Sequence, residues 1–188
     1  MQVDNNWIAF FSQSGTEINN IISHTGKVPA AIITNRQNDT GLNVYLKALK
    51  DDGAVNWIML PKNPEVKDYK KALKPFKNPL ITLHGYLRII PKEICKKYKN
   101  IYNLHPGLIT EYPDLKGKDP QIRAMQAGYP TAGAVIHKVI PAVDDGEIVM
   151  SHAINIQGLE EKEVFDRLHL LGSIMWYDFF QSYEHTDK

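Results

Sequence analysis

The first hundred residues alternate between short apolar runs and amphipathic segments, and this alternation limits the possible folds more than any other feature. The apolar runs are Trp7–Phe11, Ala30–Thr34, Val55–Leu60 and Pro79–Leu83. The segments with apolar residues at helical spacing are Thr16–His24, Leu42–Lys50 and Pro64–Leu73. Apolar runs of this kind are typical of strands buried on both faces. Right-handed crossovers then predict a Rossmann-like, mostly parallel α/β sheet with helices on both faces, and ligands at the carboxyl ends of the strands.

The second half of the chain has a different pattern. It contains, in order, a strand at Ile101–Leu104, a loop rich in Pro and Gly at 106–120, a short helix at Gln121–Ala127, strands at Ala134–Val139 and Glu147–Ile156, and a long amphipathic helix at Glu161–Tyr183. The Asp144-Asp145-Gly146 turn between the last two strands favours a hairpin or tight loop. We therefore expect antiparallel strands near the C-terminal half, and one domain over residues 1–188.

Composition and charge exclude several classes of protein. With 43% hydrophobic and 23% charged residues, the chain lacks the low hydrophobicity and high charge of disordered proteins. A net charge of +1 gives no general attraction to nucleic acid. No apolar run approaches the roughly 20 residues that span a bilayer, and the start of the chain lacks a signal-peptide pattern. The single Cys95 excludes an internal disulfide. These features predict a cytoplasmic protein without nucleic-acid or membrane partners.

The first predicted strand is followed by the turn Ser12-Gln13-Ser14-Gly15-Thr16-Glu17, which opens the first helix. Backbone N–H groups at such a turn can hold an anion. The turn has one glycine, so it matches neither the dinucleotide-binding nor the phosphate-loop motif, and a plain strand-to-helix turn explains it equally well. Glu17 would repel a bound phosphate.

Asn103 and His105 form the densest candidate site, because residues two apart on a strand share one face. A carboxamide beside an imidazole can stabilise a developing oxyanion. Asp144, in the loop after His137, can orient a water or accept a proton. The simpler alternatives are a hydrogen-bonded strand end and a turn residue. Neither a metal site nor a G-x-S-x-G hydrolase motif is indicated.

Taken in order, several segments resemble the folate-dependent formyltransferase family, and in length the chain is most similar to its phosphoribosylglycinamide (GAR) formyltransferases. These segments are Ser12–Thr16, Gly85–Ile90, Asn103–Leu108, Gly133–His137 and Val143–Ile148. The resemblance implies a formyltransferase fold and transfer of a formyl group from 10-formyltetrahydrofolate to an amine, without a metal. It places the catalytic roles on Asn103, His105 and Asp144.

The resemblance also implies binding residues. Folate is expected at Leu87, Arg88, Ile89, Ile90, Leu104, Val139, Ile140 and Val143. The acceptor is expected at Ser14, Gly15, Thr16, Glu17 and Lys67. In GAR formyltransferases a glycine stands at the position of Gln13, an asparagine at that of Glu17, and a ribose-binding glutamate at that of Gly172. Gly107 replaces the serine of the His-Pro-Ser motif, a change we expect catalysis to tolerate.

Several functions stay open at this stage. GAR, a purine precursor, is the first acceptor to consider, and a nucleotide-linked amino sugar is the alternative. A non-catalytic folate-binding homologue and a hydrolase that releases formate are further possibilities. In each case the expected partners are folate and, for a transferase, a small-molecule amine, and the protein is expected to be a monomer or homodimer.

Overall fold

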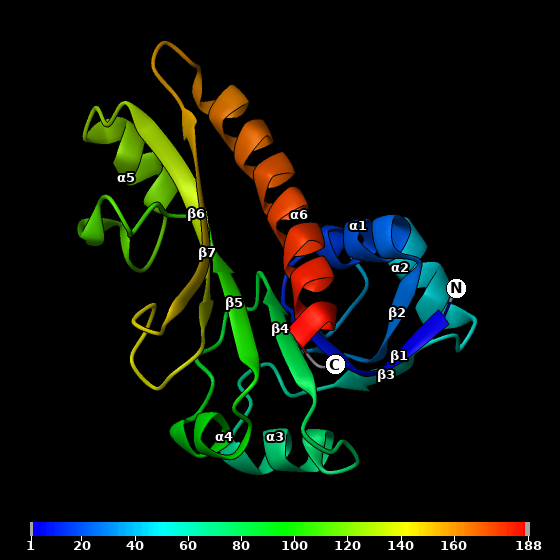
Figure 1. Ribbon diagram of the computed structural model, residues 1–188. Helices are drawn as coiled ribbons and strands as arrows, with labels where there is room; N and C mark the ends of the chain where they lie inside the picture. The colour runs from blue at the N-terminus through cyan, green and yellow to red at the C-terminus, as the bar shows by residue number, and fades with distance from the viewer. Residues whose placement is uncertain (1, 187–188) are drawn as a thin grey trace. The chain divides into compact units, whose positions relative to one another are not determined.

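The structure is a computed structural model that describes the backbone of residues 2–186 and the side chains of residue 4 and residues 6–183 (Figure 1). The chain divides into two compact units. The first comprises Met1–Asn103 and Val139–Pro141, and the second comprises Leu104–Lys138 and Ala142–Lys188.

The first unit is built on parallel strands. These are β1 (Gln2–Phe11), β2 (Lys27–Thr34), β3 (Asn56–Met59), β4 (Leu80–His84) and β5 (Ile101–His105), whose last two residues belong to the second unit. Every pairing among them is parallel, in the order β3-β2-β1-β4-β5. The predicted parallel sheet is therefore confirmed, and its carboxyl edge carries the loops that follow β1, β2, β3 and β4.

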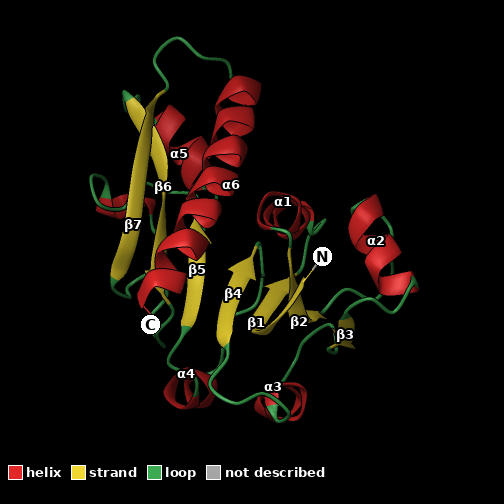
Figure 2. Ribbon diagram, turned by 45° about the vertical axis from the view of Figure 1, so that its right-hand side comes forward, coloured by secondary structure: helices red, strands yellow, loops and turns green. Residues whose placement is uncertain are grey.

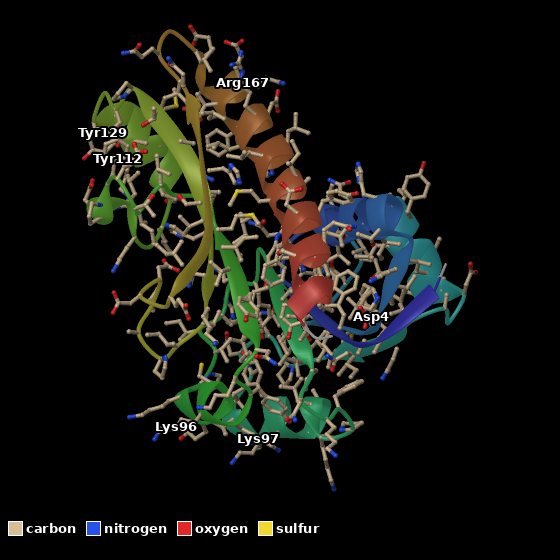
Figure 3. All side chains as sticks on the ribbon, viewed as in Figure 1. Asp4, Lys96, Lys97, Tyr112, Tyr129 and Arg167 are labelled. Carbon is tan, nitrogen blue, oxygen red and sulfur yellow. The ribbon has the colours of Figure 1, made fainter. Side chains whose placement is uncertain are left out.

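Helices cover both faces of this sheet, as predicted (Figure 2). The helices α1 (Thr16–Thr25) and α2 (Val44–Asp51) lie on one face, and α3 (Val66–Leu73) and α4 (Lys92–Lys97) lie on the other. The Asn43 side chain caps α2 by accepting bonds from the N–H groups of Tyr45 and Leu46. Lys96 and Lys97 project outward from α4 (Figure 3).

The core of the first unit lies between β1, β2 and β4 and the helices α3 and α4. It includes Ile8 and Phe10 of β1, Tyr69 and Leu73 of α3, and Ile94 of α4, all of them buried. Because both faces of these strands are covered, the strands read as continuous apolar runs rather than alternating ones.

The second unit contains an antiparallel strand pair. It comprises η1 (Pro113–Leu115), α5 (Pro120–Gln126), β6 (Thr131–Lys138), β7 (Ile148–Asn155) and α6 (Glu161–Thr186). The pairing of β6 with β7 confirms the antiparallel strands predicted near the C-terminal half. Tyr112 and Tyr129 stack with ring centroids 3.9 Å apart (Figure 3). Val164 and Leu168 of α6 pack into the apolar cluster of this unit.

Several element boundaries differ from the sequence predictions, among them the start of β2 at Lys27 and that of β6 at Thr131. β1 begins at Gln2 rather than at Trp7, because its polar start pairs with β2. The loop predicted at 106–120 contains the short 3-10 helix η1. No helix among the described residues is long and apolar enough to cross a membrane.

Candidate functional site

Strand β5 carries the two residues of the Asn-x-His motif. Asn103 pairs in register with Leu83 of β4, and His105 ends the strand. Since side chains alternate along a strand, Asn103 and His105 leave it on the same face. Asn103 is half-buried and His105 is 4% exposed, so water has little access to the imidazole.

Within the second unit, Asp144 lies between two histidines. One carboxylate oxygen is 3.4 Å from Nδ1 of His105, and the other is 3.4 Å from Nε2 of His137. All three side chains are largely buried. The predicted proximity of His105 and Asp144 is therefore seen, and His137 joins them as a residue to which the sequence analysis gave no role.

The backbone around Asp144 is held in an unusual conformation. Asp144 has a φ of 51°, in the left-handed region that few residues other than glycine adopt. The N–H of Gly117 donates a 3.0 Å hydrogen bond to its carboxylate. Gly146 is required nearby, because a Cβ there would lie 1.7 Å from the carbonyl oxygen of Lys138. Residues with a strained backbone are concentrated at functional sites. Here the turn directs the Asp144 carboxylate toward the two histidines.

Burial and neighbouring charges shift the pKa values of His105 and Asp144 in opposite directions. Burial lowers the pKa of His105, although the Asp144 carboxylate and the Leu115 carbonyl both favour the protonated ring. Burial also opposes ionisation of Asp144, but the hydrogen bond from His137 and the proximity of His105 hold the pKa of this carboxyl below its usual value. The free protein therefore holds an ionised Asp144 beside a neutral imidazole. These opposing effects of burial and charge depend on the folded chain and could not be predicted from the sequence.

The imidazole of His105 is fixed by contacts on two sides. Its Nε2 donates a 2.9 Å hydrogen bond to the carbonyl of Leu115, which leaves Nδ1 facing Asp144. A Cβ built on Gly107 would lie 2.6 Å from Nε2 of His105 and 2.8 Å from Cβ of Pro120. Position 107 is therefore under a tight steric limit, since a side chain there would have to displace the His105 ring or Pro120.

The predicted acceptor residues form hydrogen bonds and ion pairs with other residues of the chain. Gly15 has a φ of 74° and precedes α1, and the hydroxyls of Ser14 and Thr16 are 2.9 Å apart. The Glu17 carboxylate accepts a 2.8 Å hydrogen bond from Nδ1 of the buried His84. Lys67 lies apart from this turn on α3, where its ammonium is 2.9 Å from the carboxylate of Glu65.

The predicted folate residues differ in exposure. In the first unit, Leu87 and Ile89 are 60% and 71% exposed, and Ile140 is also exposed. Ile90 is buried in the core of the first unit. The remaining members are Arg88, Leu104 and Val139, which are half-buried, and Val143, which is exposed. Exposed aliphatic side chains suit contact with a flat heteroaromatic ligand.

The sequence analysis missed two pairings, that of His137 with Asp144 and that of His84 with Glu17. Each pairing joins residues from separate elements, so no local sequence motif indicates it. Among the residues that the structure describes, no three His, Cys, Asp or Glu side chains are arranged to hold a metal ion.

Comparison with known proteins links this geometry to one family. A family model described as "Formyl transferase" matches residues 7–177. A methionyl-tRNA formyltransferase from Bifidobacterium longum is 35% identical over 120 residues, which cover 63% of this chain and 35% of that protein. The chain thus spans about a third of the length of that relative.

Two further proteins resemble a larger part of the chain. A phosphoribosylglycinamide formyltransferase from Haemophilus influenzae is 31% identical over 173 residues, covering 83% of this chain and 77% of that protein. The crystal structure of a phosphoribosylglycinamide formyltransferase from Anaplasma phagocytophilum has a TM-score of 0.79 and 20% identity, covering 93% of this chain and 84% of that one. At this identity, the structural match supports the fold alone.

Proposed function

The chain belongs to the formyl transferase family, and from this premise we propose that it transfers a formyl group from 10-formyltetrahydrofolate to the amine of a small acceptor, with GAR as the first candidate. The observation that carries the proposal is the ionised Asp144 held beside the buried imidazole of His105. Formyl transfer needs a donor for a developing oxyanion and a route for one proton, and these residues supply both.

The reaction balances without a covalent intermediate on the protein. The acceptor nitrogen forms a bond to the formyl carbon, and the bond between that carbon and the folate nitrogen breaks. One proton leaves the acceptor amine and one is gained by the folate nitrogen. The protein therefore has to stabilise charge on the formyl oxygen and to move a proton between two nitrogens.

In this proposal Asn103 and His105 stabilise the formyl oxygen. The Asn103 carboxamide donates a hydrogen bond to it, and the ring of His105, once protonated, places a positive charge beside it. Because burial lowers the pKa of His105, the ring binds its proton most strongly when negative charge appears beside it. This electrostatic stabilisation is thus stronger in the transition state than in the ground state, which is the condition for catalysis.

Asp144 has two proposed tasks. Its carboxylate faces both histidines, so it favours the protonated form of His105 and fixes the orientation of that ring. It also positions a water that relays the proton from the amine to the departing nitrogen. His137 acts as a positioning residue, because its Nε2 faces Asp144 while its Nδ1 lies 3.1 Å from the carbonyl oxygen of Lys138.

Folate binding is proposed for the residues that the family resemblance indicates. The exposed side chains of Leu87, Ile89 and Ile140 offer apolar contacts to such a ligand. Val139 anchors its own segment, because its N–H donates a 2.7 Å bond to the carbonyl of Ile101.

Two acceptors are supported by different observations. GAR is favoured by the Haemophilus influenzae relative, which matches most of the chain and is a phosphoribosylglycinamide formyltransferase. A nucleotide-linked amino sugar is the second candidate, and the pairing of Glu17 with His84 favours it, because a carboxylate at this turn suits sugar hydroxyls better than a phosphate.

The proposal is tested by the absorbance change on deformylation of 10-formyltetrahydrofolate, measured with GAR, with nucleotide-linked amino sugars and without acceptor. Turnover that requires GAR and is lost in Asn103→Ala and Asp144→Ala supports the proposal. Turnover only with an amino sugar changes the acceptor, and formate release without acceptor indicates a hydrolase. Folate binding without turnover under all conditions refutes catalysis.

A further inference from the structure

The 114–118 loop, which leads from η1 toward α5, supplies two main-chain contacts to the candidate site. The carbonyl of Leu115 accepts the 2.9 Å hydrogen bond from Nε2 of His105. The N–H of Gly117 donates the 3.0 Å hydrogen bond to the Asp144 carboxylate. All these residues belong to the second unit. Because both contacts are made by peptide groups, the orientation of the two side chains depends on the conformation of this loop.

Most of this loop is exposed to solvent. Leu115 is buried in the apolar cluster of the second unit, but Lys116, Gly117 and Lys118 are exposed. Gly117 has a φ of 86°, in the left-handed region. The ammonium of Lys116 is 2.6 Å from the carboxylate of Asp145, yet both side chains are about half exposed, and such ion pairs add little stability. An exposed loop of this kind keeps one conformation only if further bonds reach its main chain.

Arg123, a half-buried residue of α5, makes three such bonds. Its Nε donates a 3.0 Å hydrogen bond to the carbonyl of Lys118, and one terminal nitrogen donates a 2.7 Å bond to the carbonyl of Lys116. The other terminal nitrogen donates to the carbonyl of Asp114. The three accepting residues alternate along the chain with the two that contact the candidate site. One guanidinium therefore holds the main chain on both sides of each contact.

The bond from Arg123 to Lys116 acts directly on the contact with Asp144. The carbonyl of Lys116 and the N–H of Gly117 belong to one planar trans peptide group, in which they point in opposite directions. Arg123 holds one side of this group while Asp144 accepts a hydrogen bond from the other side. The preceding peptide group carries the Leu115 carbonyl, and it lies between two groups that Arg123 holds.

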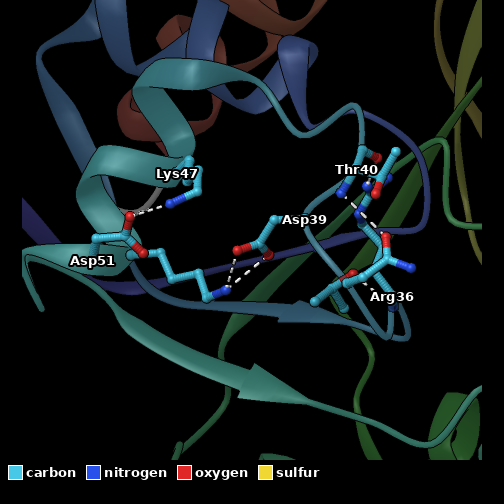
Figure 4. Close-up of polar contacts among 8 residues, drawn as sticks. Arg36, Asp39, Thr40, Lys47 and Asp51 are labelled. Atoms are coloured by element: carbon cyan, nitrogen blue, oxygen red, sulfur yellow. Dashed lines mark hydrogen bonds and ion pairs between the residues drawn. The ribbon is translucent and has the colours of Figure 1, made fainter.

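The planar guanidinium suits this task because it presents several N–H donors in a fixed fork. Arg36 of the first unit binds the main chain in the same way, since its two terminal nitrogens donate to the carbonyls of Gln13 and Thr40, the latter drawn in Figure 4. A lysine at position 123 would keep the positive charge, but its single nitrogen could not span three carbonyls. The substitution Arg123→Lys therefore separates the charge of this residue from its geometry.

The charge of Arg123 also acts on His105. Burial is the main cause of the lowered pKa of His105, and the positive charge of Arg123 lowers this pKa further. The charge thus favours the neutral ring in the free protein, and the hydrogen bonds of the same guanidinium fix the carbonyl to which that ring donates.

We propose that Arg123 is a positioning residue for formyl transfer. By holding the 114–118 loop, it orients the side chains of His105 and Asp144. The inference rests on the proposed function, because it takes these two side chains as the groups that act on the formyl oxygen and on the transferred proton. Arg123 acts through the loop and not on the substrate, so its replacement should slow the chemical step and leave substrate binding nearly unchanged.

The first test is the steady-state kinetics of Arg123→Lys. The kcat for formyl transfer is expected to fall by about tenfold or more, while KM for each substrate changes by less than about threefold. The matched control is Arg167→Lys, the same substitution at an exposed arginine of α6 in the same unit (Figure 3), and it should leave both constants unchanged. A wild-type kcat in Arg123→Lys, or a raised KM with an unchanged kcat, would overturn the inference.

NMR spectroscopy distinguishes a positioning role from a general loss of stability. In folded Arg123→Lys the imidazole signals of His105 should shift, and the amide of Gly117 should exchange with solvent at least about tenfold faster than in the wild type. The imidazole signals of His24, in the first unit, should stay in place. A variant that is less stable but keeps the wild-type signals of His105 and the wild-type exchange of Gly117 would refute the positioning role.

The wild-type protein offers a test that needs neither a variant nor turnover. Although Gly117 is exposed, its amide should exchange at least about tenfold more slowly than in an unfolded chain, because it is bonded to Asp144. Exchange at the unfolded rate would overturn the inference even if Arg123→Lys does not fold. A wild-type protein that transfers no formyl group refutes the proposed function instead, and the NMR measurements then still decide whether Arg123 holds the loop.

Discussion

Replacing Gly107 with alanine tests the steric relation between the Pro-Gly loop and His105. The added Cβ would lie 2.6 Å from Nε2 of His105, while ordinary contacts begin at 3.4 Å. The ring must therefore move by up to the difference of 0.8 Å, or the loop must move instead. On the other side, Pro120 at 2.8 Å limits the retreat of the loop.

The size of the effect follows from this geometry. Overpacking a well-filled site costs about 1–3 kcal/mol, which for a chain of this length lowers the melting temperature by roughly 2–12 °C. Displacing a catalytic group by about 1 Å can reduce the rate by about a hundredfold. We therefore expect Gly107→Ala to fold, to melt earlier and to lose most of its formyl-transfer rate.

The assay combines thermal unfolding with kcat for formyl transfer, and Lys118→Ala, an exposed substitution in the same loop, serves as the control. The imidazole NMR signals of His105 should shift in Gly107→Ala and stay in place in Lys118→Ala. A Gly107→Ala protein with wild-type kcat and melting temperature would refute the steric argument.

Three further predictions concern charge and buried hydroxyls. Asp144→Asn removes the carboxylate that faces both histidines, so kcat should fall by about a hundredfold or more and the pKa of His105, followed by NMR titration, should fall further. The pKa of His105 is lowered in the folded protein, so the unfolded chain binds more protons than the folded one as the pH falls through about 6.5. The wild type should therefore lose more thermal stability between about pH 7.5 and pH 5.5 than His105→Gln does. Tyr86→Phe breaks the buried 2.8 Å hydroxyl bond with Tyr69 and should destabilise the fold by about 1 kcal/mol in urea unfolding, whereas a midpoint equal to that of the wild type would contradict this.

The parallel half of the fold was predictable because its strands are buried on both faces. Runs such as Trp7–Phe11 are apolar throughout, and this pattern follows directly from packing between two helical layers. The start of β1 was not predictable, because residues 2–6 are mostly polar and this part of the strand is held in the sheet by backbone pairing of residues 2–4 with β2. Side-chain patterns carry no signal for a strand that depends on main-chain hydrogen bonds.

The candidate site was predictable only in part. Asn103 and His105 share a local motif, and strand alternation places them on one face. The partners of Asp144 and Glu17 were not evident, since His137 and His84 come from separate elements and meet them only in the folded chain. The left-handed backbone conformation of Asp144 was not predictable either, because an aspartate in a turn need not adopt that conformation.

The most direct test of the account follows the formyl carbon itself. Carbon-13-labelled 10-formyltetrahydrofolate is incubated with GAR and the wild-type protein, and the label is traced by NMR. The account predicts that the label appears in a formamide on the acceptor nitrogen, and that this signal is lost in His105→Ala although the variant remains folded. Label recovered only as formate, or transfer that persists in His105→Ala, would contradict it.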